Sequence, residues 1–223
     1  LREIKPKGMI FLGGSVANFQ KGFANISVPS VLATLVSDEL DFPNLSMVGV
    51  DDRAAAYQAV SYLIQQGHRK IAVLGGPATS HPSMMRRQGA QQAMEDAGIR
   101  FEDKLYGLSN YDFESAYHAM NGLLARRAEF TALFAMSDVI AFGAIRALVS
   151  AGLRVPEDVS VIGFDGITMS RYCVPVMTTI VQPSEQIALQ SIELLVRQIE
   201  HGTPAQTVTL QPELQQGESV RAL

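Results

Sequence analysis

The chain has 223 residues, of which 47% are hydrophobic, 18% charged and 7% aromatic, and its formal net charge is -4. This balance is typical of a globular α/β protein, and it argues against a strongly basic surface for nucleic acid. No apolar run approaches the length of a membrane span, and the first residues lack the apolar core of a signal peptide. The single cysteine, Cys173, excludes an intrachain disulfide, so we expect a cytoplasmic protein without a membrane partner.

Short apolar runs alternate with amphipathic segments along the chain. We expect strands at residues 7–12, 29–33, 47–50, 71–74, 105–108, 132–135, 159–164, 177–181 and 207–210. We expect helices at residues 16–25, between Asp52 and Gly67, and at residues 83–97, 113–125, 139–150 and 187–199. Residues 37–46 are polar and are expected to form a loop. Strands that alternate with helices of about 10–15 residues predict βαβ units, and therefore an α/β fold with doubly wound parallel sheets.

The motifs of the common catalytic and cofactor sites are missing from this sequence. No glycine-rich nucleotide motif follows a strand, and no P-loop or G-x-S-x-G nucleophile elbow occurs. The histidines are scattered and lack metal-ligand spacing, and no histidine is placed to activate Cys173. We therefore expect no enzymatic activity, no catalytic residue, no cofactor and no metal.

Polar side chains follow successive predicted strands, at the edge where open α/β sheets bind ligands. The apolar run 159–164 ends in Asp165, and the corresponding places after other strands hold Asp51, Arg86, Tyr111, Ser137, Asp138 and Gln182. Each of them alone also has a structural explanation, for example as a helix cap. Together they supply carboxylates, a guanidinium, an amide and an aromatic ring, which is the chemistry that recognises hydroxyl groups. Because the acids outnumber the single arginine, we expect a neutral or weakly charged polyol rather than an anion.

Several motifs resemble those of one known family. Residues 63–77 (LIQQGHRKIAVLGGP) are similar to a signature of the LacI/GalR family of transcriptional regulators. Further similar motifs follow in the family's order at residues 86–89 (RRQG), 137–144 (SDVIAFGA), 155–165 (VPEDVSVIGFD) and 175–183 (PVMTTIVQP). The resemblance extends from Lys7 to about Ser219, which is nearly the whole chain.

The resemblance implies a periplasmic-binding-protein-like fold, with two α/β subdomains joined by three crossovers and a small-molecule effector between them. Residues 1–50 and 183–211 would form the N-terminal subdomain, and residues 51–182 and 212–223 the C-terminal one. Arg86, Tyr111, Ser137, Asp165 and Gln182 fall at the family's effector-contact positions. Asp51 falls at a crossover that borders the cleft, and His68 at a structural turn. Where many members have Asn or Gly, this chain has Ser137.

The resemblance also implies a homodimeric repressor that binds operator DNA through a helix-turn-helix, a segment that this sequence does not contain. The sequence starts at what resembles the third strand of the N-terminal subdomain, so we expect that subdomain to be incomplete. A sugar-binding protein of a transport or chemotaxis system shares the fold and is the alternative. The identity of the effector, its action as inducer or corepressor, and a dimer or tetramer stay open at this point.

Overall fold

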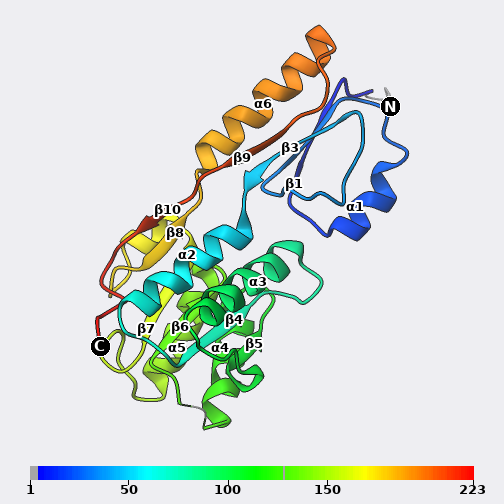
Figure 1. Cartoon of the computed structure of the whole chain (residues 1–223). Helices are drawn as coiled ribbons and strands as arrows, with labels where there is room; N and C mark the ends of the chain where they lie inside the picture. Colours follow the sequence, from blue (N-terminus) through cyan, green and yellow to red (C-terminus); the bar gives the residue numbers. More distant parts are fainter. Residues whose placement is uncertain (1–4, 128) are drawn as a thin grey trace. The chain divides into compact units, whose positions relative to one another are not determined.

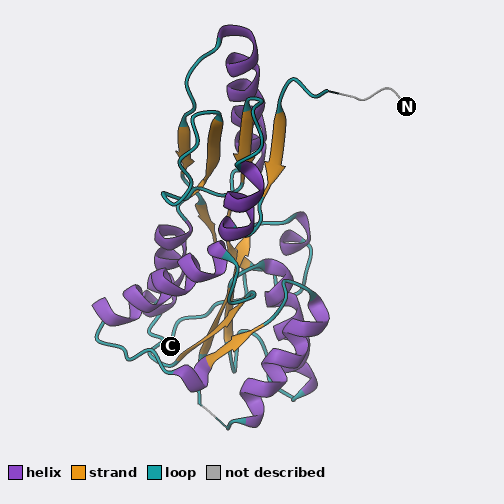
Figure 2. Ribbon diagram, turned by 90° about the vertical axis from the view of Figure 1, so that its right-hand side faces the viewer, coloured by secondary structure: helices purple, strands orange, loops and turns teal. Residues whose placement is uncertain are grey.

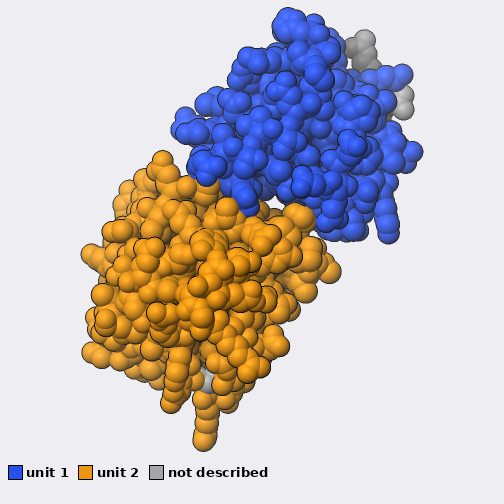
Figure 3. Space-filling model, in the orientation of Figure 1, with its two compact units in different colours: residues 1–51, 183–211 blue, residues 52–182, 212–223 orange. Residues whose placement is uncertain are grey.

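The computed structural model describes residues 5–127 and 129–223. Residues 1–4, which we assigned to the N-terminal subdomain, and residue 128 lie outside this part. The chain divides into two compact units: unit 1 comprises residues 1–51 and 183–211, and unit 2 comprises residues 52–182 and 212–223 (Figures 1 and 3). The chain passes between them at residues 51–52, 182–183 and 211–212. Asp51 therefore belongs to unit 1, one residue from the boundary expected from the sequence.

Unit 1 is built on a parallel sheet. Its strands lie in the order β1 (Met9–Leu12), β2 (Ser30–Ala33), β3 (Leu45–Val50) and β9 (Thr207–Leu210). Successive side chains of a strand point to opposite faces, and β2 packs accordingly. Leu32 belongs to the core beneath α1 (Val16–Phe23), whereas Val31 and Ala33 belong to the core beneath α6 (Ser184–His201). Both faces are thus covered, and every residue of β2 and β3 is buried.

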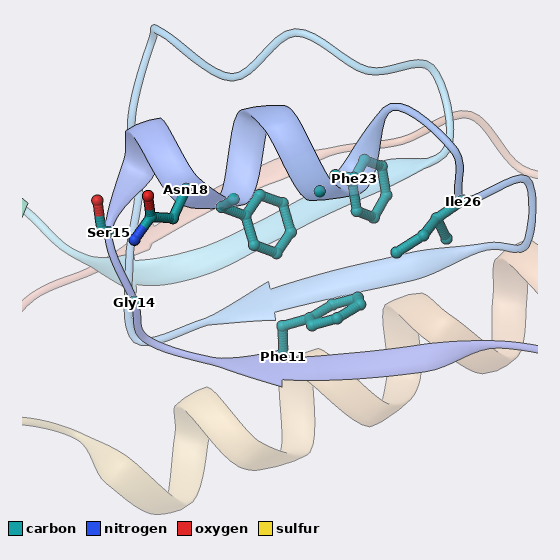
Figure 4. Close-up of a pocket in the computed structure, with 8 residues that line it drawn as sticks. Phe11, Gly14, Ser15, Asn18, Phe23 and Ile26 are labelled. Atoms are coloured by element: carbon teal, nitrogen blue, oxygen red, sulfur yellow. The ribbon is translucent and has the colours of Figure 1, made fainter.

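An apolar pocket of about 380 Å³ lies on the α1 side of unit 1. Phe11 of β1 faces Phe23 and Ile26 beneath α1 (Figure 4). The rings of Phe11 and Phe19 pack edge to face, with 5.1 Å between their centroids. Gly14, Ser15, Asn18 and Gly22 complete the lining, so the pocket contains none of the predicted site residues.

Unit 2 is built on a larger, mixed sheet. Its strands lie in the order β10 (Glu213–Gln215), β8 (Thr178–Val181), β7 (Ser160–Asp165), β6 (Ala132–Ala135), β4 (Ile71–Gly75) and β5 (Tyr106–Leu108). All neighbours pair in parallel except β10, which runs antiparallel to β8. The predicted α/β class with parallel sheets is confirmed, and β10 adds one short antiparallel strand that the sequence analysis did not predict. β10 is short and mostly polar, so it has no alternation of apolar and polar residues from which a strand could be predicted.

Helices flank the unit 2 sheet on both sides (Figure 2). They are α2 (Asp52–Gln65), α3 (His81–Asp96), α4 (Phe113–Ala125) and α5 (Asp138–Ser150), with short 3-10 turns at Asp103–Leu105 and Thr168–Arg171. The pair α2–α3 and the pair α4–α5 each cross at a glycine. A side chain at Gly89 would overlap the backbone of Arg53, and one at Gly143 would overlap the backbone of Phe113. Glycine therefore permits both close helix contacts.

The predicted element boundaries are close to those observed. Residues 113–125, 132–135 and 207–210 coincide with α4, β6 and β9, whereas α6 starts at Ser184, three residues before the expected start. β3 starts at Leu45, inside the expected loop, because Leu45 and Ser46 already pair with β2. None of the helices in the described part of the chain is both long enough and apolar enough to cross a membrane.

The C-terminal residues are fastened to unit 2 at the amino end of its sheet. Ser219 O accepts a hydrogen bond from Val161 N at 2.7 Å, and Leu223 N donates to Gln66 O at 2.9 Å. His68 is fully buried, with Nε2 3.1 Å from Arg221 O and Nδ1 2.9 Å from Thr131 Oγ1. These contacts give His68 the structural role expected of it.

Candidate functional site

Arg86 is a buried cation at the carboxyl end of the unit 2 sheet. It lies on α3, its side chain is 7% exposed, and Nε donates to Asp52 Oδ1 at 2.7 Å. Nη1 donates to the carbonyl of Met136 and lies 3.6 Å from Asp165 Oδ1. The guanidinium carbon stacks 3.6 Å from the centroid of the Phe164 ring. One side chain thus joins α2, the end of β6 and the end of β7.

The charges of Arg86, Asp52 and Asp165 depend on one another. Burial by itself disfavours the Arg86 charge, but Asp52 and Asp165 outweigh that effect, and the pKa of Arg86 is raised above its usual value. Burial also disfavours ionised Asp165, and because Arg86 and Gln182 offset this only in part, the pKa of Asp165 is raised. A ligand group that donates to Asp165 would therefore stabilise its ionised form.

Asp165 lies in a strained turn directly at the end of β7. Its φ is 108°, a region that residues with a Cβ rarely adopt, and Gly166 follows with φ 70°. Gln182 holds Asp165 twice, because the Gln182 amide N donates to Asp165 O at 3.0 Å and Nε2 donates to Asp165 Oδ1 at 2.7 Å. The Asp165 side chain remains 28% exposed. A ligand can thus reach its carboxylate.

Tyr111 lies in the loop between β5 and α4 and has a φ of 60°. Its ring packs against Gly76, where a Cβ would overlap the ring. The Tyr111 hydroxyl is buried and has no hydrogen-bond partner among the residues that the structure describes. A buried, unpaired hydroxyl costs roughly 1–3 kcal/mol. A bound ligand that pairs with it would remove this cost.

Ser137 and Asp138 begin α5, and both are buried. Ser137 Oγ accepts from Ile140 N at 3.1 Å, which is the hydrogen bond of a helix N-cap. The carboxylate of Asp138 is directed into unit 2, where it accepts from Thr179 Oγ1 at 2.6 Å and from Ile167 N at 2.9 Å. The sequence analysis placed Asp138 among the candidate effector-binding residues. In the structure none of its surface is exposed.

Asp51 belongs to unit 1, where it directly follows β3 and is exposed. Its part in the site stays a prediction. Three residues that contact Arg86 or Asp138 in unit 2 were not predicted as part of the site. They are Asp52, Phe164 and Thr179. The sequence analysis named Asp52 only as the start of a helix, since nothing in the sequence shows which acid of the Asp51–Asp52 pair is buried. Phe164 and Thr179 looked like ordinary strand residues.

No group of three or more His, Cys, Asp or Glu residues in the described part of the chain could hold a metal ion. Burial raises the pKa of the Cys173 thiol, which disfavours the nucleophilic thiolate. The guanidinium, carboxylate, amide and phenol at the carboxyl end of the unit 2 sheet are suited to binding through hydrogen bonds.

Residues 60–220 match the family model described as a periplasmic binding protein-like domain. The chain belongs to this family, in the form found in LacI-type transcriptional regulators. The regulator MalR of Clostridium butyricum is 36% identical over 221 residues, which cover 98% of this chain and 66% of MalR. The repressor CytR of Escherichia coli K12 is 38% identical over 172 residues, covering 77% of this chain and 50% of CytR.

Solved structures of LacI-type regulators have the same fold. A complex of the transcriptional regulator CelR with cellobiose superposes with a TM-score of 0.87 at 30% identity, covering 96% of this chain and 65% of CelR. The Escherichia coli repressor ascG superposes with a TM-score of 0.80 at 30% identity, covering 96% of this chain and 78% of ascG. The resemblance stated from sequence motifs is thereby confirmed. The relatives are transcriptional regulators rather than enzymes, as expected.

The chain spans from half to about two thirds of the length of these curated relatives. What the family shows for this chain is a ligand-binding regulatory domain.

Proposed function

We propose that the chain is the ligand-binding and dimerisation core of a LacI/GalR-type repressor, and that its effector is an uncharged polyhydroxy compound such as a sugar. The proposal rests above all on the group formed by Arg86, Asp165 and Gln182 at the carboxyl end of the unit 2 sheet. A carboxylate and an amide side by side can bind vicinal hydroxyl groups, each of which donates and accepts. Tyr111 adds a ring and an unpaired hydroxyl to the same end of the sheet.

The charge balance favours a neutral ligand over an anion. Asp52 and Asp165 are both within ion-pair distance of Arg86, so the single guanidinium is already compensated. An anionic ligand would have to displace one of these carboxylates or bind beside them, at an electrostatic cost. The cellobiose complex of a relative supports the sugar, whereas a sugar-binding LacI-family regulator of Escherichia coli was solved with phosphate. An anion is therefore the competing ligand class.

In such a repressor, the effector acts by binding one conformational state more tightly than another. Its operator DNA would be bound by a helix-turn-helix, as in the curated relatives that are named HTH-type regulators. The protein would then act in the cytoplasm, where the DNA is. The alternative, a sugar-binding protein of a transport or chemotaxis system, is disfavoured because the relatives are transcriptional regulators.

We further propose a homodimer that uses an exposed apolar patch of unit 2. The patch comprises Val149 of α5 and Met169, Tyr172 and Val174 after β7, which are 51%, 58%, 77% and 93% exposed. Val149 and Val174 line the same shallow pocket of about 420 Å³. Exposed apolar side chains of this kind are typical of protein interfaces. Val174→Glu should weaken the dimer in sedimentation experiments, whereas Leu108→Glu, at an exposed apolar residue outside the patch, should not.

Thermal melting of the full-length protein tests the effector class. A ligand that binds only the folded state raises the melting midpoint. When the ligand concentration is about 100 times Kd, the free energy of unfolding increases by about 2.7 kcal/mol. The panel should contain neutral sugars including cellobiose, their phosphates, and purine nucleosides. A rise with a neutral sugar supports the proposal. A rise only with the phosphates contradicts it, whereas a rise only with the nucleosides contradicts the sugar but not an uncharged ligand with vicinal hydroxyl groups.

A further inference from the structure

The carboxylate of Asp138 lies where three elements of unit 2 meet. Asp138 is the first residue of α5, and none of its surface is exposed. Oδ1 accepts from Thr179 Oγ1 of β8 at 2.6 Å, and Oδ2 accepts from Ile167 N, two residues beyond β7, at 2.9 Å. The backbone amide of Gly166 also favours the ionised form of this carboxylate. One side chain from α5 thus holds β8 and the turn that leaves β7.

β7 leaves space for this carboxylate. A Cβ at Gly163 would overlap Asp138 Oδ1 and would lie 3.3 Å from Thr179 Oγ1. The Asp138 carboxylate therefore occupies the volume that a side chain of β7 would otherwise fill. From there it reaches the amides of Gly166 and Ile167.

The turn held in this way carries Asp165. Asp165 and Gly166 have φ values of 108° and 70°, so two consecutive residues adopt left-handed backbone conformations. Such a conformation persists at a residue with a Cβ only when surrounding contacts over-determine it. Gln182 supplies these contacts to Asp165 itself, and Asp138 supplies them to the next two residues. The direction of the Asp165 carboxylate depends on both.

We propose that Asp138 is a positioning residue, which fixes the Asp165–Gly166 turn and thereby aims the Asp165 carboxylate, without touching the effector. The importance of this role for binding rests on the function proposed above. The dependence of the turn on Asp138 does not, because it can be measured without a ligand.

The ionisation of Asp138 gives this role a spectroscopic signature. Burial raises the pKa of Asp138 to about 6, against the opposing effect of the hydrogen bonds from Thr179 and Ile167. The titratable groups whose charges interact with it are Asp165 of β7 and Cys173 beyond the turn. A carboxylate accepts stronger hydrogen bonds than a neutral acid does. The hold on Gly166 and Ile167 should therefore weaken as the pH falls through about 6.

Amide resonances of the full chain, labelled with ¹⁵N at glycine and isoleucine, test the proposal. In the wild type, Gly166 and Ile167 should titrate together with a midpoint near 6. The titration should disappear in Asp138→Asn, which keeps an acceptor oxygen but cannot ionise, and should persist in Asp165→Asn. In Asp138→Ala, where Ile167 N loses its acceptor, its hydrogen exchange should become at least about tenfold faster. The control Asp112→Asn, at the N-cap of α4, should leave both resonances unchanged.

Two results would overturn the proposal. The first is that Gly166 and Ile167 titrate in Asp138→Asn as they do in the wild type, in which case another group controls the turn. The second is that Asp138→Asn shifts the labelled amides of Ile64 in α2 and Gly89 in α3 as much as those of the turn, in which case its role is general support of the fold. If no effector binds at this end of the sheet but the titration follows Asp138, the proposed function fails and the positioning role stands.

Discussion

Arg86 and Asp52 form a buried ion pair, with Nε 2.7 Å from Oδ1 and each side chain 7% exposed. Asp52 begins α2, and Arg86 lies on α3, so the pair ties together two helices that also cross closely at Gly89. A buried charge is stable only while its partner is present, because its desolvation is otherwise uncompensated. The candidate site therefore depends on a residue that does not need to contact a ligand.

Asp52→Ala should be strongly destabilising. It leaves the buried Arg86 guanidinium with the longer contact to Asp165 as its remaining ion pair among the described residues, and breaking a buried pair in this way typically costs about 3–5 kcal/mol. Urea unfolding measures the change. The control is Glu129→Gln, which breaks the exposed pair between Lys70 and Glu129 and should have no measurable effect. Equal stability of the two variants would mean that the buried pair contributes nothing.

Gly143→Ala should destabilise unit 2, because its Cβ would overlap the backbone of Phe113 and the side chain of Ala116 where α5 crosses α4. Overpacking of this kind typically costs about 1–3 kcal/mol. The matched control is Gly122→Ala on α4, where a Cβ would meet nothing within 4 Å. That change should stabilise the helix by up to about 1 kcal/mol. Chemical denaturation of both variants gives the comparison, and a neutral Gly143→Ala would show that the helices can move apart.

Asp138 should make the free energy of unfolding depend on pH. Its pKa is raised from 3.8 in the unfolded chain to about 6 in the folded one, so its contribution is full below about 3.8 and is lost as the pH rises through about 6. At about 1.4 kcal/mol per pKa unit, the loss is about 3 kcal/mol. Unfolding of Asp138→Asn beside the wild type isolates this contribution. Parallel pH profiles for the two proteins would refute it.

His68 should act in the opposite direction. Burial lowers the pKa of His68 below its usual 6.5, with the hydrogen bond to Arg221 O opposing that effect. Its contribution to stability is therefore present above about pH 6.5 and is lost as the pH falls through the folded pKa. His68→Gln should flatten this part of the profile. Proteolysis of the C-terminal residues at acidic pH offers a second readout, since His68 holds Arg221 and Thr131. If the C-terminal residues of the wild type resist proteolysis at acidic pH as well as they do at neutral pH, this account is contradicted.

Sequence patterns predicted the fold well where the signal was local. Helices such as Phe113–Ala125 have a capping residue, Asp112, and a regular apolar stripe, and the buried strands are continuous apolar runs. β10 was missed because its pairing with β8 depends on residues far apart in the sequence. The same limit applies to the site. Strand ends identified Arg86 and Asp165 as candidates, but the burial of Asp52 and the inward direction of Asp138 follow from packing between helices and strands.

The central claim is that Asp165, at the carboxyl end of the unit 2 sheet, binds an uncharged polyhydroxy effector. The most direct test is calorimetric titration of the full-length protein with the neutral sugar that raises its melting midpoint, in the wild type and in Asp165→Asn. The account predicts binding by the wild type and at least about tenfold weaker binding by the variant, because a charge-assisted hydrogen bond contributes about 1.5–3 kcal/mol. Equal affinities, with both proteins equally folded, would contradict it.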